Sequence, residues 1–174
     1  MLDFETIVSW EGMNTYEECL FASIGSSGYG TGIYGLVYHS IHKSAAFTCG
    51  VINNGAATNL ATTIGRTKIS GVHNKGAVEV YVNDVYTNAG TTDALSNKSI
   101  WMFIPNGHAR NIVSGYNAVY RLEYLKFSEN QQPIAEFFPT IHQGQAGMVD
   151  AITGTFHPNA NTEGQFTIQV TDKQ

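Results

Sequence analysis

The chain has 174 residues, of which 43% are hydrophobic and only 13% are charged. This length suits one domain of residues 1–174, while 18 glycines and 11% aromatic residues exclude a disordered chain and disfavour a helical bundle. The net charge of −5 argues against a nucleic-acid-binding protein, because contact with phosphates needs a basic face.

Neither a membrane span nor an export signal is predicted. The chain has no long apolar run, so we expect no membrane insertion. Its start, MLDFETIVSWEG, carries acidic residues where a signal peptide carries basic ones, so we expect folding in the cytoplasm. Cys19 and Cys49 lie in apolar runs and should be free, buried thiols, because their spacing fits no zinc site.

Apolar residues recur at every second position in short segments separated by Gly and Asn. This pattern is typical of an all-β protein, here with about ten to twelve strands. Segment 2–10 alternates in this way, and Phe4, Thr6 and Val8 should share one face. Further strands in the first half of the chain are predicted at 19–24, 33–41, 45–52, 67–72 and 77–82. Turns at 42–44 and 73–76 should join the last four of these in pairs.

The last of these segments leads into a predicted hairpin. Val78 and Val80 should share one face of the strand. Asn83 and Asp84 follow, and both residue types tolerate positive φ, so they predict a tight two-residue turn. The polar segment 88–98 is predicted to be a loop.

Segment 99–104, SIWMFI, is apolar on both faces. It is therefore predicted to be a central, buried strand, with Trp101 and Phe103 in the core. The remaining predicted strands are 120–127, 133–138 and 165–170, with a turn at 128–132.

Two segments of the chain resemble a known family. KGAVEVYVNDVYT, followed by SIWMFIPN, resembles the strand–turn–strand and buried strand of laminin-G-like and concanavalin A-like jelly rolls. Segment 119–167 resembles the tail of such domains in gut bacteria and their phages. The matching tail residues are Tyr120, Leu122, Tyr124, Phe137, Phe138, Pro139, Gly147, Val149, Asp150, Gly154, Phe156, Asn159, Gly164 and Phe166. An aromatic residue usually precedes this Asp in the family, whereas Met148-Val149 stands here.

This resemblance covers residues 76–168 well and residues 1–75 only in strand rhythm. It implies an antiparallel two-sheet jelly-roll sandwich of the concanavalin A-like type. Such domains usually begin with one more strand than this chain has. Segment 2–10 is therefore expected to be an uncovered sheet edge, completed by a second copy of the chain or by another protein.

The phenylalanines of the tail are predicted to have a structural role. Phe137, Phe138, Phe156 and Phe166 are spaced so that an irregular loop could close one end of the sandwich with large apolar side chains. Asp150, in VDAITG, is predicted to form an Asx turn with its own backbone.

Catalytic motifs are not apparent, so no enzymatic activity is predicted. Glycosidases of this fold class pair carboxylates as E-x-D-x-x-E, and Asp3, Glu5 and Glu11 do not fit that spacing. No G-x-S-x-G motif occurs. Residues 30–35 spell G-x-G-x-x-G, but their surroundings indicate a loop rather than a dinucleotide site.

No cofactor or metal is predicted either. Asp84, Asp93 and Asp150 are isolated from one another, which disfavours a calcium site. The histidines, all expected at surface or loop positions, are His39, His42, His73, His108, His142 and His157.

A glycan site is a possible interpretation of the loops. Amide side chains fit sugar hydroxyls, and aromatic faces stack on sugar rings. The candidate residues, which flank predicted strand ends, are Asn53, Asn54, Asn106, His108, Tyr29 and Tyr34, with Trp101 nearby. The same residue types also make ordinary turns, so both interpretations stay open.

Three functions compete: a structural or attachment protein of a bacteriophage virion, a stand-alone carbohydrate-binding module and a glycoside hydrolase. The first is favoured. The chain starts at Met1 and shows no signal peptide, and a phage protein folds in the host cytoplasm and is released by lysis. The expected location is the virion. The expected partners are other virion proteins, further copies of the chain and a cell-surface glycan.

Overall fold

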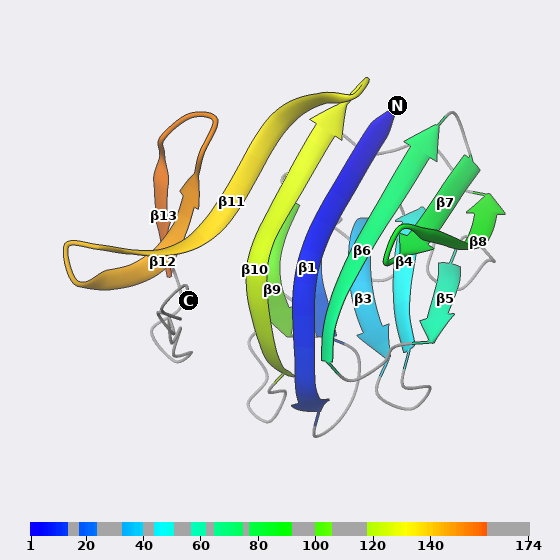
Figure 1. Ribbon diagram of the computed structural model, residues 1–174, viewed down its shortest axis with the longest axis horizontal. Helices are drawn as coiled ribbons and strands as arrows, with labels where there is room; N and C mark the ends of the chain where they lie inside the picture. The colour runs from blue at the N-terminus through cyan, green and yellow to red at the C-terminus, as the bar shows by residue number, and fades with distance from the viewer. Residues whose placement is uncertain are drawn as a thin grey trace.

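The computed structural model describes the backbone of residues 1–13, 18–23, 33–39, 44–50, 57–61, 65–74, 77–91, 100–105 and 118–159. Side chains are described for residues 1–9, 65–74, 77–87, 89 and 121–159. Within these residues the protein is all-β, and no helix occurs among them (Figure 1). The all-β prediction is confirmed.

The strands form two antiparallel sheets. The first has eight strands in the order β13 (Phe156–Pro158), β12 (Gln145–Asp150), β11 (Gln132–His142), β10 (Ala118–Glu129), β1 (Leu2–Met13), β6 (Gly65–Asn74), β7 (Ala77–Val82) and β8 (Val85–Thr91). The second has five strands in the order β5 (Ala57–Ala61), β4 (Ser44–Gly50), β3 (Ile33–His39), β2 (Glu18–Ser23) and β9 (Ile100–Pro105).

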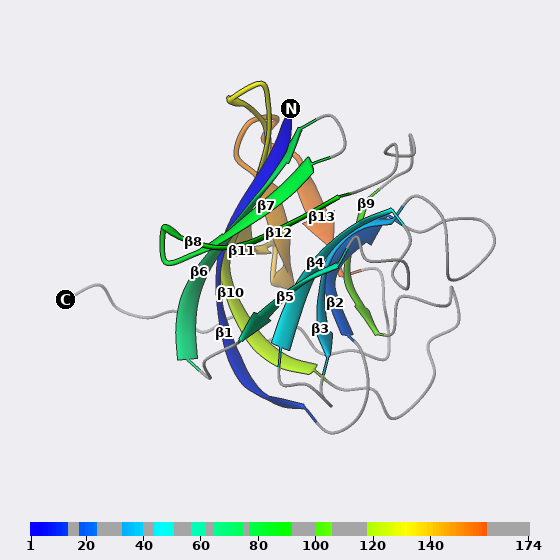
Figure 2. The same ribbon diagram turned by 90° about the vertical axis from the view of Figure 1, so that its right-hand side faces the viewer.

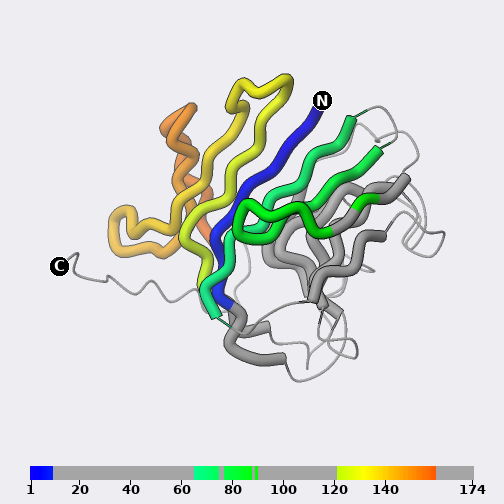
Figure 3. The backbone as a smooth tube through the Cα atoms, turned by 45° about the vertical axis from the view of Figure 1, so that its right-hand side comes forward, coloured from blue at the N-terminus to red at the C-terminus, as the bar shows by residue number. Residues whose placement is uncertain are grey.

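The five-stranded sheet lies on one side of β10, β1 and β6 (Figure 2). Strand β5 contacts β7 and β8, so the two sheets approach each other at that end. Strands β11, β12 and β13 continue the larger sheet away from β10, on the side opposite β8 (Figures 1 and 3). We refer to these three strands as the arm.

One face of the eight-stranded sheet is buried. Phe4, Thr6 and Val8 of β1 are almost fully buried, as their alternation predicts. The other buried apolar residues described are Ile69, Val78, Val80, Leu125, Phe127 and Met148. Because consecutive side chains in a strand point to opposite faces, the residues between them form a second face, called the outer face below.

Strands β6, β7 and β8 form two consecutive hairpins, and the pairing of β6 with β7 was predicted. The two-residue turn is confirmed, since φ is 50° at Asn83 and 65° at Asp84. The predicted loop at 88–98 is wrong in its first part, because β8 continues to Thr91. Pairing with β7, which joins Ala77 to Thr91, overrides the low strand propensity of this Asn/Gly-containing segment.

The expectation that segment 2–10 forms a sheet edge is wrong. Strand β1 pairs with β10 on one side and with β6 on the other, so that Phe4 lies between Phe127 and Gly71. Both hydrogen-bonding edges are occupied by the chain itself, and strand addition by a partner at this position is excluded. Alternation shows which residues face the core, but it does not show which distant strands become neighbours.

The segment with Trp101 and Phe103 was expected to be a central, buried strand, and it forms β9 (Ile100–Pro105). Among the described strands, β9 pairs with β2 alone and stands at the end of the five-stranded sheet. A strand that is apolar on both faces is expected to have both faces buried. This pattern does not show whether the strand has one or two hydrogen-bonded neighbours. The side chains of Trp101 and Phe103 lie outside the described residues.

The tail is more regular than its sequence indicates. Phe137 and Phe138 lie in β11, which confirms the predicted strand 133–138, whereas Phe156, expected in an irregular loop, lies in β13. Each successive strand of the arm pairs with the one before it, which satisfies the backbone without a loop. Phe166 and the predicted strand 165–170 lie outside the described residues.

Candidate functional site

A network of charged side chains covers the centre of the outer face. Lys68 of β6 places Nζ 2.9 Å from Oε2 of Glu5 and 2.7 Å from Oδ1 of Asp84. The hydroxyl of Tyr124 donates a hydrogen bond of 2.6 Å to Oε1 of Glu5. Four strands or turns are thereby tied together around one ammonium group.

The network holds its groups in their ordinary ionisation states. Burial raises the pKa of Glu5, but the hydrogen bonds from Tyr124 and Lys68 together lower it by more, so the net shift of this pKa is downward. The hydrogen bond to Asp84, followed by that to Glu5, raises the pKa of Lys68. Burial and the bond to Glu5 raise the pKa of Tyr124. Near neutral pH these are a carboxylate, an ammonium group and a phenol, and none of the three is poised as a proton-transfer group.

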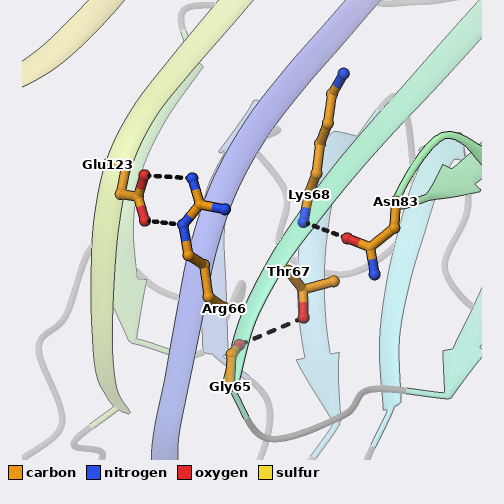
Figure 4. Close-up of polar contacts among 6 residues, drawn as sticks. All are labelled: Gly65, Arg66, Thr67, Lys68, Asn83 and Glu123. Carbon is orange, nitrogen blue, oxygen red and sulfur yellow. Dashed lines mark hydrogen bonds and ion pairs between the residues drawn. The ribbon is translucent and has the colours of Figure 1, made fainter.

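A second ion pair crosses β1. Arg66 donates from Nε and Nη2 to the two carboxylate oxygens of Glu123, at 2.5 and 2.9 Å (Figure 4). The register of β1 and β10 shifts between the pairs Ile7–Tyr124 and Val8–Leu122, so Glu123 is the extra residue of a bulge. Without this bulge, strict alternation would direct Glu123 and Tyr124 to opposite faces.

The turn between β7 and β8 is fastened to β6. The Asn83 backbone N–H donates to the Lys68 carbonyl at 2.9 Å. The Lys68 N–H donates to Oδ1 of Asn83 at 3.1 Å (Figure 4). The turn therefore has a fixed position beside the charged network.

A row of apolar side chains runs across the outer face beside this network. Ile7 of β1 lies directly opposite Tyr124 of β10. Phe138 of β11 lies opposite Val149 of β12, and Val149 in turn lies opposite Phe156 of β13. The ring centroids of Tyr124 and Phe138 are 6.2 Å apart and connect the two halves. These five residues, which we call the outer row, are all partly exposed.

The rings of the outer row are held by their neighbours. The hydroxyl of Tyr124 is fixed by Glu5. The ring of Phe156 lies over Gly147, where an added Cβ would come within 2.6 and 2.8 Å of two ring carbons. His142 also contacts this ring, with the two ring centroids 5.2 Å apart. Such rings lose little conformational freedom when a ligand contacts them.

Asp150 anchors the arm. Its Oδ1 accepts hydrogen bonds from the backbone N–H groups of Glu136, at 3.0 Å, and Ile152, at 3.1 Å. Its Oδ2 accepts one from the Thr153 hydroxyl at 2.7 Å. Burial raises the pKa of Asp150, but these hydrogen bonds lower it more, so the net pKa lies below its ordinary value. These are the contacts of an Asx turn, with an added link to β11.

One predicted histidine environment is wrong. His73 is buried at 9% exposure and lies opposite Leu2 and Val78 in the sheet. Its Nε2 has no hydrogen-bond partner, and burial lowers its pKa. His142 and His157 are exposed, as expected. Ile69 of β6 is buried on the inner face. His73 is four residues further along the same strand, and alternation therefore places it on the same face.

The glycan site expected from the sequence stays a prediction, because the side chains of its residues lie outside the described part of the chain. Asn53, Asn54, Asn106, His108 and Tyr29 lie outside the described residues, and Tyr34 lies in β3 with its side chain also outside them. The outer row was not predicted as a site. The sequence did contain one indication of it. The turn at Asn130-Gln131 makes β10 and β11 a hairpin, which brings Tyr124 and Phe138 close together.

Metal and membrane features were searched within the described residues. No group of three or more His, Cys, Asp or Glu residues there could hold a metal ion. No helix of that part of the chain is long and apolar enough to cross a membrane.

Comparison of the chain with protein-family models, with curated proteins and with solved structures returned no match.

Proposed function

We propose that the chain is an antiparallel two-sheet jelly-roll sandwich of the concanavalin A-like type. We further propose that it serves, without enzymatic activity, as a structural or attachment protein of a bacteriophage virion. In this proposal it folds in the host cytoplasm and assembles with other virion proteins, with further copies of itself, or with both.

The observation that carries the proposal is the folding of the two segments on which the resemblance rests. The first forms the hairpin β7–β8 with its two-residue turn. The second forms β10 to β13 as consecutive antiparallel neighbours. A five-stranded sheet beside the eight-stranded one is what the sandwich requires.

The carboxylates of the outer face favour a non-enzymatic role over a hydrolase. Glycoside hydrolysis needs two carboxyl groups facing one bond, one of them kept protonated. Here Glu5 is held by Tyr124 and Lys68, and Glu123 is held by Arg66. Both carboxylates of these two contacts are therefore already engaged by basic or hydroxyl groups.

Mass spectrometry of purified particles tests the virion role. Particles from cells that make the protein are separated on a density gradient, and the chain is quantified against the major capsid protein. We expect the chain to co-sediment at a constant ratio to the capsid protein across the particle peak. Recovery of the chain only in the soluble fraction would refute the proposal.

A carbohydrate-binding module is the second candidate, and the outer row favours it. Aromatic rings that are partly exposed and held in place offer apolar faces for sugar rings. Glu5 and Lys126, which are paired in register beside the row, offer an acceptor and a donor for hydroxyl groups.

A glycan array on the isolated chain tests this second candidate. Phe138→Leu keeps an apolar side chain but removes the aromatic face, and Ile134→Ala, at a position 49% exposed and off the row, is the matched control. We expect the Leu variant to lose glycan binding and the control to retain it. Absence of binding by the unmodified chain, or equal binding by both variants, would remove this candidate.

A further inference from the structure

The hairpin tip, residues 81–87, exposes apolar side chains on both of its faces. Val85 is 67% exposed and its neighbour Tyr86 is 55% exposed. Adjacent residues in a strand point to opposite faces, so neither face of the tip is covered at this point. A strand end that merely lay on the body of the protein would have one of these residues buried.

A bulge bends the tip away from the sheet. The register of β7 and β8 shifts between the pairs Val80–Asn88 and Tyr81–Tyr86, which leaves Thr87 as the extra residue. Such a bulge increases the local twist and bends the strand. Figure 2 shows the turn between β7 and β8 extending on the side opposite the five-stranded sheet. The tip therefore stands out from the outer face.

The tip is rigid as well as prominent. Its turn is fastened to β6 by two hydrogen bonds between Asn83 and Lys68. The rings of Tyr81 and Tyr86 meet edge to face, with centroids 5.9 Å apart. A rigid element that already has its binding shape loses little entropy on association, and tyrosine is among the residues enriched at the energetic centres of protein interfaces.

The charged residues of the hairpin are both acidic. Between residues 77 and 91 the only charged residues are Glu79 and Asp84. The Asp84 side chain is 72% exposed and its Oδ1 pairs with Nζ of Lys68 at 2.7 Å. Glu79 accepts a hydrogen bond from the Tyr81 hydroxyl. With Lys68 counted, the charged groups at the hairpin still carry a net negative charge. An apolar tip flanked by carboxylates complements an apolar groove flanked by lysine or arginine.

We propose that the hairpin tip is a docking element that inserts Tyr86 and Val85 into an apolar groove with a basic rim on a different protein. A second copy of this chain is a poorer match, because the chain has a net charge of −5. The proposal does not depend on the virion role, since the tip belongs to the isolated chain and its partner is found by a different measurement.

Site-specific cross-linking in the cells that make the protein tests this docking element. The photoreactive residue p-benzoylphenylalanine replaces Tyr86 in the full chain, and the matched control carries it in place of Ile141. Tyr86 and Ile141 are both 55% exposed, but Ile141 lies on the arm. Mass spectrometry of the digested adduct identifies the cross-linked segment of the partner.

We expect an adduct from position 86 at a yield at least about tenfold above that from position 141, with a partner segment that is apolar and bordered by lysine or arginine. With that partner purified, Tyr86→Ala should weaken binding at least about tenfold, or 1.4 kcal/mol, and Tyr86→Phe should retain it. No adduct, equal yields at both positions, an adduct with a second copy, or an uncharged or acidic partner segment would overturn the proposal.

Discussion

The inner and outer faces of the eight-stranded sheet use the same strands for different purposes. On the inner face, Phe4, Val8 and Leu125 are almost completely removed from water. On the outer face, the neighbouring residue Glu5 takes part in a polar network with Lys68. Burial of apolar area, roughly 25 cal/mol per Å², therefore stabilises the protein mainly from one side.

The comparison also shows how polar groups are treated on each face. Buried Thr6 donates a hydrogen bond of 2.7 Å to the Tyr124 carbonyl, and buried Asp150 accepts three hydrogen bonds. An unpaired polar group would be costly there. The outer-face pair of Arg66 and Glu123 has side chains 63% and 46% exposed, so water can replace either partner. Thr6 and Asp150 are thus fully paired inside, although Nε2 of buried His73 has no partner, whereas the ion pair outside is exchangeable with water.

The largest effect is expected from truncation of the inner face. Phe4→Ala should lower the free energy of unfolding by about 3–5 kcal/mol, because it leaves a cavity beneath β1. Urea unfolding with a fixed m-value measures this change. A loss below about 1 kcal/mol would show that Phe4 is not in a packed core.

The next largest effect concerns Asp150, and it should depend on pH. Its folded pKa lies below the unfolded value of about 3.9, so its contribution to stability is present above that value and is lost as the pH falls through the folded pKa. Asp150→Asn should cost about 1.5–3 kcal/mol at pH 7. Urea unfolding from pH 7 down to acid should show this difference shrinking as Asp150 becomes protonated in both states, and a difference independent of pH would contradict the account.

Gly147→Ala tests whether close packing occurs on the outer face of the arm. The new Cβ would meet the His157 carbonyl oxygen and the Phe156 ring, so a loss of about 1–3 kcal/mol is expected from overpacking. Gly144→Ala is the control, because its Cβ would meet nothing within 4 Å and only its φ of 80° is unfavourable. Equal thermal stability of the two variants would show that Phe156 does not lie over Gly147.

The smallest effect is expected for Glu123→Gln. Exposed ion pairs contribute little, and salt screens them. The variant should keep the urea midpoint of the unmodified protein within experimental error, at both low and high salt. A clear loss at low salt would mean that the pair of Arg66 and Glu123 is structural, and the distinction between the two faces would then be weaker.

Local patterns in the sequence predicted the local parts of the fold. Alternation identified the inner-face residues of β1, and the pair Asn83-Asp84 identified the turn. The position of β1 between β10 and β6 depends on pairing between segments far apart in the chain. Alternation and turn chemistry carry no information about that pairing, which is why β1 was wrongly expected at a sheet edge.

The candidate site was less predictable than the fold for the same reason. The outer row exists only when β1, β10, β11, β12 and β13 are aligned in register. Phe138 and Phe156 were identified from the sequence as structural residues, but their common face was not. The bulge that places Glu123 beside Tyr124 is likewise a property of two paired strands.

The position of β1 is the central claim, since the two faces are defined by it, and hydrogen exchange of residues 3–9 tests it most directly. In a strand paired on both sides, every backbone N–H has an acceptor, so we predict slow exchange at all of these amides. In an edge strand, every second N–H points to solvent. Fast exchange at alternate residues of β1 would therefore contradict the account.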